Sequence, residues 1–132
     1  MDEKTKKAII KILDEIIPKE YYQMWSHLYS NFFNTPQKVF EIFDLYSREL
    51  GIGVDDNIIH QRVFIEEDNR EFEGYIELYG TIGELKIPAV VFYTLLFDIC
   101  TEVDKVIKMK EIDLYLFRFK NLIEKYKKQF PV

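Results

Sequence analysis

Apolar side chains recur at spacings of three and four along the first fifty residues, which is the period of a helix with one buried face. Pro18 interrupts the first run. The dipeptide Thr35-Pro36 offers a hydroxyl cap followed by a proline suited to a first helical turn. Gly51 stands where a C-terminal cap is expected. The pattern therefore predicts three consecutive helices, over 3–17, 19–33 and 36–50.

The period changes to two between residues 71 and 79, which is typical of an antiparallel strand with one solvent-exposed face. The outward set is Glu71, Glu73, Tyr75, Glu77 and Tyr79, and the inward set is Phe72, Gly74, Ile76 and Leu78. Around this strand we expect a loop over 51–57, a strand over 58–66 (a short helix is the alternative), a turn over 67–70 and a returning strand over 84–87. Together these predict a meander of two or three strands, which must pack on helices to be stable.

Residues 88–107 are apolar almost all round, which indicates a buried helix, and Pro88 suits its first turn. After a break over 106–110, a final amphipathic helix is expected over 111–129. Because strands and helices do not alternate, a parallel sheet is not expected. The predicted fold is α+β and mainly helical, in a single domain over 1–132. It has three N-terminal helices, a small antiparallel sheet and two C-terminal helices.

Composition agrees with a folded domain rather than a disordered chain, since 48% of the 132 residues are hydrophobic and 31% are charged. Cys100 is the single cysteine, so an internal disulfide is impossible, as is usual in a reducing cytosol. The apolar run near the N-terminus is interrupted by Lys11 and Asp14, unlike a signal peptide. We therefore expect a cytoplasmic protein without a membrane span.

Groups that could carry chemistry are few and scattered. His27, His60 and Cys100 are far apart and form no zinc-binding motif, and the glycines form no phosphate-binding loop. Asp98 is the one acid within the most apolar stretch, and we expect it to be exposed there, with pairing to Arg118 or Lys120 as the alternative. We expect no catalytic residues, no cofactor and no metal, so the chain is not predicted to be an enzyme.

Charge is uneven, because residues 41–85 hold three arginines against twelve acids, a net charge of −9 in a chain whose total is −5. This acidity disfavours nucleic-acid binding and favours a basic protein partner. We expect the contact surface at the alternating strand and its turn, with the row of acids as a guard against sheet aggregation as the alternative. The predicted partner-binding residues are Glu66, Glu67, Asp68, Glu71, Glu73, Tyr75, Glu77 and Tyr79.

In size, acidity and lack of catalytic motifs the chain resembles bacterial immunity proteins, which neutralise a partner toxin, often a basic nuclease. The resemblance implies an inhibitor that docks on a basic toxin without nucleic acid or membrane, as a monomer or homodimer. A second interpretation is a helical adaptor that dimerises through the isoleucine-rich first helix. A third is a ligand binder or enzyme with a pocket near Trp25, Tyr29 and Tyr93.

Overall fold

The part of the chain that precedes the sheet is helical, as predicted. The computed structural model describes residues 1–35, 37–50, 52–54, 57–60, 74–80 and 83–130. Its first helical elements are α1 (Glu3–Ile16), the short 3-10 helix η1 (Lys19–Tyr21), α2 (Tyr22–Phe33) and α3 (Val39–Ser47). Asp2 caps α1 by accepting a hydrogen bond from the Thr5 N–H at 2.7 Å. The helix ends at Ile16, and Ile17 after it has the extended backbone that the following Pro18 favours.

The ends of α3 differ from the prediction. Thr35 does not cap this helix, because its hydroxyl donates to the Asn31 carbonyl at 2.8 Å and so closes α2 instead. The helix begins at Val39, after Lys38, whose N–H donates to the Glu41 carboxylate at 3.3 Å. It ends at Ser47, and Glu49 takes the left-handed conformation expected of a glycine at this position, with φ at 61°.

The middle of the chain forms a four-stranded antiparallel sheet in the order β1-β2-β3-β4. Its strands are β1 (Ile52–Val54), β2 (Asn57–His60), β3 (Tyr75–Gly80) and β4 (Gly83–Pro88). The prediction of two or three strands was too low, because β1 lies in the stretch taken as a loop and is too short to show alternation. The predicted strand over 58–66 is confirmed as far as His60, and its remaining residues lie outside the described part of the chain.

The C-terminal helices are α4 (Ala89–Ile107) and α5 (Ile112–Gln129). Phe92, Leu96, Ile99 and Val103 are fully buried along α4, which confirms it as the central core helix. Its C-terminus is closed by Asp104, whose carboxylate accepts from the Met109 N–H at 2.7 Å. The α+β fold with three helices, a small sheet and two helices is therefore as predicted.

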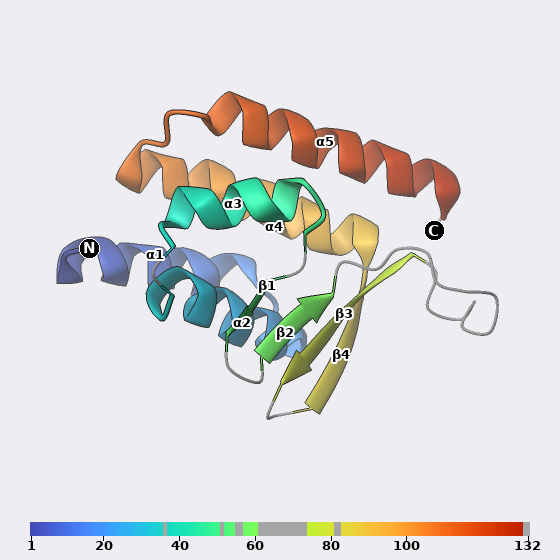
Figure 1. Cartoon of the computed structure of the whole chain (residues 1–132), viewed down its shortest axis with the longest axis horizontal. Coiled ribbons are helices and arrows are strands. Elements are labelled where there is room, and N and C mark those ends of the chain that lie inside the picture. Colours follow the sequence, from blue (N-terminus) through green and yellow to red (C-terminus); the bar gives the residue numbers. More distant parts are fainter. Residues whose placement is uncertain (36, 51, 55–56, 61–73, 81–82, 131–132) are drawn as a thin grey trace.

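Packing around α4 determines which surfaces remain free. Figure 1 shows α5 running alongside α4, with α1 and α2 on the other side and the sheet toward one end, and these helices contact one another in that arrangement. One hydrophobic cluster draws buried residues from every α-helix and from β3 and β4. Within the described residues, no helix is both long enough and apolar enough to cross a membrane.

Candidate functional site

The predicted acidic and tyrosine-rich surface can be followed at three of its eight residues. Tyr75, Glu77 and Tyr79 share one face of β3, opposite the fully buried Ile76 and Leu78, so the predicted alternation is present. The remaining five, Glu66, Glu67, Asp68, Glu71 and Glu73, lie outside the described part of the chain.

The expectation that this row is exposed is wrong at Glu77. Tyr75 is 38% exposed, but Glu77 is only 5% exposed, and its carboxylate accepts a hydrogen bond from the Tyr79 hydroxyl. The reason is the place of β3 inside the sheet, where Glu77 lies between His60 of β2 and Lys86 of β4 in the strand register. Because β3 is not an edge strand, these residues do not guard a sheet edge either.

Of the three scattered groups His27, His60 and Cys100, the first and the last are buried, and the side chain of His60 lies outside the described part of the structure. His27 ties α2 to the sheet, since Nδ1 lies 2.7 Å from the Gln23 carbonyl oxygen and Nε2 lies 2.7 Å from that of Tyr79. Burial raises the pKa of the Cys100 thiol to about 12, with a smaller contribution from Asp104, so the reactive thiolate is disfavoured. Among the described side chains, no group of three or more His, Cys, Asp or Glu could hold a metal ion.

The pocket expected near Trp25, Tyr29 and Tyr93 is not formed by these three residues together. Trp25 and Tyr29 stack on each other on α2, with ring centroids 5.2 Å apart. Tyr93 is fully buried and stacks on Tyr126 of α5, so it shares no surface with the other two rings.

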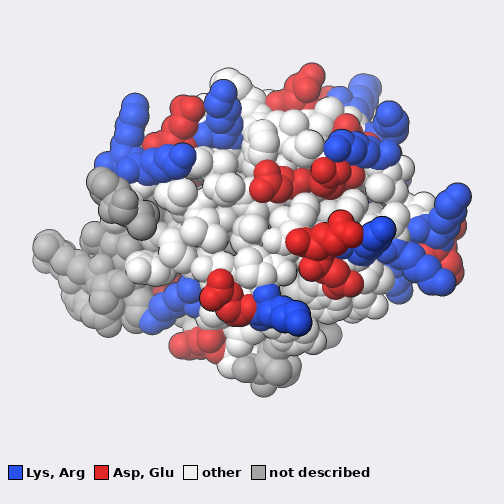
Figure 2. Space-filling view, turned by 180° about the vertical axis from the view of Figure 1, so that it is seen from behind, with Lys and Arg blue, Asp and Glu red and all other residues white. Residues whose placement is uncertain are grey.

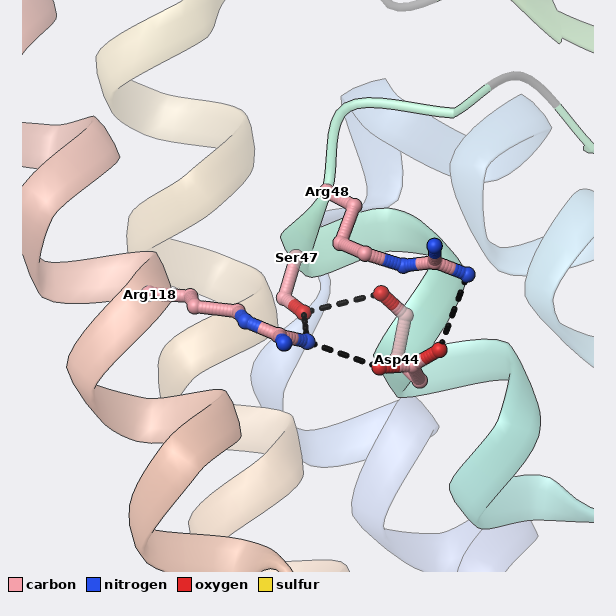
Figure 3. Close-up of polar contacts among 4 residues, drawn as sticks. All are labelled: Asp44, Ser47, Arg48 and Arg118. Atoms are coloured by element: carbon pink, nitrogen blue, oxygen red, sulfur yellow. Dashed lines mark hydrogen bonds and ion pairs between the residues drawn. The ribbon is translucent and has the colours of Figure 1, made fainter.

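A polar cluster between α3 and α5 fixes the two helices to each other (Figure 3). The Arg118 guanidinium donates to Asp44 at 2.7 Å and to the Ser47 hydroxyl at 3.3 Å. Arg48 contacts the second oxygen of the Asp44 carboxylate at 3.0 Å. Both carboxylate oxygens are thus occupied, and the cluster is a structural clamp rather than an open binding site.

A groove between α1 and α4 offers a different arrangement, with apolar and acidic side chains side by side. We call it the α1–α4 groove, and its volume is about 450 Å³. Its lining residues are Ile12, Glu15 and Ile16 from α1 and Phe97, Asp98, Thr101 and Glu102 from α4. Figure 2 looks onto the face of the molecule that carries α1 and α4 and shows acidic side chains gathered near its middle, beside uncharged surface.

Helical periodicity explains why the groove combines these side chains. On α1, Ile9 and Leu13 are fully buried, which leaves Ile12 and Ile16 at the flank of the buried stripe and half-exposed. On α4, Asp98 and Glu102 are one turn apart and therefore lie on one side of the helix. The wide isoleucine stripe of the first helix was a signal for this groove, but its pairing with α4 was not readable from the sequence.

The three acids of the groove differ in their surroundings. Glu15 pairs with Lys11 at 3.9 Å, and Glu102 pairs with Lys105 at 3.0 Å, both within their own helix and exposed. Asp98 is exposed, as expected, and makes no hydrogen bond or ion pair with any residue in the described part of the chain. Its alternative partner Arg118 binds Asp44 instead.

Asp98 is therefore the acid best placed to receive a charge from outside. Partial burial, and then the neighbouring Glu102, raises the pKa of the Asp98 carboxyl. An approaching cation would reverse this effect and stabilise the carboxylate.

Comparison with models of known protein families, with curated proteins and with solved structures found no match for this chain.

Proposed function

We propose that the chain is a non-catalytic binding protein that inhibits a basic protein partner, in the manner of an immunity protein acting on a toxin. The observation that carries the proposal is the α1–α4 groove, where a half-buried apolar floor lies beside three carboxylates. This combination suits a cationic, amphipathic segment of a partner protein.

Lysine and arginine side chains fit such a groove by their own construction. Their aliphatic stems cover apolar surface while the charged head remains at the edge. In the α1–α4 groove the stem would lie on Ile12, Ile16 and Phe97, and the head would reach Asp98. The existing pairs of Glu15 and Glu102 with lysines are exposed, so they hold these acids weakly and allow exchange with a partner.

The charge of the whole chain supports the same partner. A net charge of −5 accelerates encounter with a basic protein and slows encounter with an acidic one. Inhibition would follow from steric cover, since a protein docked over or beside a toxin's active site keeps its substrate away without any chemistry of its own.

A defined peptide tests the binding step. The probe is an amphipathic leucine–lysine peptide of about five helical turns, and the comparison is a leucine–glutamate peptide of the same length. We expect fluorescence anisotropy to show binding of the basic peptide only. Asp98→Lys should weaken this binding by about tenfold or more.

The matched control is Glu124→Lys, which makes the same change of charge at an exposed position of α5 outside the groove. Binding close to that of the wild type is expected for this variant. Equal weakening by both substitutions would mean that only net charge matters and would overturn the assignment to the groove.

The inhibition step needs a natural partner, and the product of the gene adjacent to this chain's gene is the first candidate. If it is a basic toxin, co-expression with the wild-type chain should restore growth, and co-expression with the Asp98→Lys variant should not. Restoration by both variants would place the inhibitory contact elsewhere.

A further inference from the structure

The end of the molecule away from the sheet holds a second and larger cavity, of about 750 Å³. We call it the end cavity. It is bounded by the first turn of α1, the segment from the end of α2 to the start of α3, and the end of α4. Its volume is within the range of sites that bind small molecules.

Apolar side chains form half of the lining of the end cavity, and polar or charged side chains form the other half. Phe32 and Val39 are buried in its floor, whereas Met1, Phe40 and Val106 are 66%, 40% and 37% exposed at its mouth. Exposed apolar surface that is continuous with a cavity is costly in water and is typical of a site that an apolar ligand covers. The apolar half of the lining therefore offers a surface to the hydrocarbon body of a ligand.

Two lysines in the lining of the end cavity offer ammonium groups to an anionic head group. The Lys6 ammonium is held 5.3 Å from the centroid of the Phe33 ring, and Lys38 enters from the segment before α3. Two acids also line the cavity, Asp2 and Glu3, but both lie at the N-terminus of α1, where they complement the helix dipole. Asp2 is further occupied by its bond from the Thr5 N–H.

We infer that the end cavity binds an amphipathic anion, a fatty carboxylate whose hydrocarbon chain lies on the phenylalanine and valine walls and whose head group lies beside Lys38. The inference goes beyond the proposed function and does not depend on it, because it uses a different cavity and a ligand of opposite charge.

Calorimetric titration with dodecanoate below its micelle concentration tests this site, with dodecanol and dodecylamine as uncharged and cationic analogues. We expect dodecanoate to bind and dodecanol to bind about tenfold more weakly. Dodecylamine should bind no better than dodecanol. Lys38→Met should remove the difference between the carboxylate and the alcohol while the alcohol still binds.

The filling variant is Val106→Trp, and its matched control is Leu114→Trp, which changes an equally exposed residue of α5 that does not line the cavity. Dodecanoate binding should be lost only in the first. Equal loss in both variants, or no binding to the wild type, would overturn the inference. The inference would also be overturned by a homodimer that excludes dodecanoate and dissociates in Val106→Trp, because a second copy of the chain would then occupy the end cavity.

Discussion

The hydroxyl of Tyr126 donates a hydrogen bond to the carboxylate of Glu49, the residue that takes the left-handed conformation after α3. Lys125 adds a charge 3.8 Å from the same carboxylate. The C-terminal part of α5 thus holds the connection between α3 and the sheet, and the strain of a non-glycine residue at positive φ is offset by tertiary contacts.

Removal of the Tyr126 hydroxyl should show how much its hydrogen bond to Glu49 contributes to the free energy of unfolding. We expect Tyr126→Phe to lower the free energy of unfolding by about 1–2 kcal/mol, because the bond is to a charged acceptor and the ring is almost fully buried. Urea titration provides the measurement. The control is Tyr22→Phe, since Tyr22 is 58% exposed and should tolerate loss of its hydroxyl. An equal effect of both substitutions would contradict the role given to Glu49.

Buried phenols should make the fold sensitive to alkali. Burial raises the pKa of Tyr46, Tyr93 and Tyr126 above the ordinary value of 10.0. These phenols therefore ionise more readily in the unfolded chain than in the folded one. Their contribution to the free energy of unfolding is fully present below pH 10.0 and is lost as the pH rises above it. Urea titrations between about pH 9 and 12 should show this decline, less steeply in Tyr126→Phe. A decline of unchanged slope would exclude Tyr126 as a contributor.

The ionised Asp98 carboxyl should lower the stability of the fold and strengthen binding of the leucine–lysine peptide. Its pKa is raised above the ordinary 3.8, so the protonated form favours the fold and the stabilisation is lost as the pH rises through the folded-state value. We expect Asp98→Asn to raise Tm at neutral pH, by an amount that vanishes below pH 3.8, and to weaken binding of the leucine–lysine peptide. Calorimetry and anisotropy check the two effects. A variant that loses both stability and binding would instead show a structural role.

The clamp between α3 and α5 should depend more on one arginine than on the other. Arg118 is 29% exposed and joins two helices, whereas Arg48 is 47% exposed and pairs within its own segment. We expect Arg118→Met to cost about 1 kcal/mol of unfolding free energy and Arg48→Met less. Urea titration of both variants, and of the double variant, measures the coupling. A larger loss of unfolding free energy in Arg48→Met than in Arg118→Met would mean that the contact of Arg118 between the two helices is the weaker of the two.

The local pattern of apolar residues was sufficient to predict an element where burial of one of its faces determines its structure. The apolar stretch over 88–107 indicated a buried helix, and α4 is the centre of the core. The period of two over 71–79 correctly separated Ile76 and Leu78 from Tyr75 and Tyr79. It could not show that Glu77 is covered, because that depends on the neighbouring strands rather than on the alternation.

Boundaries and surfaces required tertiary information. Thr35 has the chemistry of a cap for the next helix, but it bonds back to Asn31, and nothing local distinguishes the two choices. The α1–α4 groove joins Ile16 to Phe97, two residues far apart in sequence, so the sequence showed its apolar stripe and its lone Asp98 separately. The candidate site became visible only when the packing of the two helices was known.

Cys100, the chain's single cysteine, is sealed within α4 and its thiol is held in the protonated form. Cys100 is therefore an intrinsic probe for transient unfolding of the core. Thiol-reactive dyes should modify the native protein only as fast as the core transiently unfolds, and the labelling rate should rise with urea in parallel with global unfolding. Substitutions in either candidate site can then be compared for their effect on the core without any engineered label.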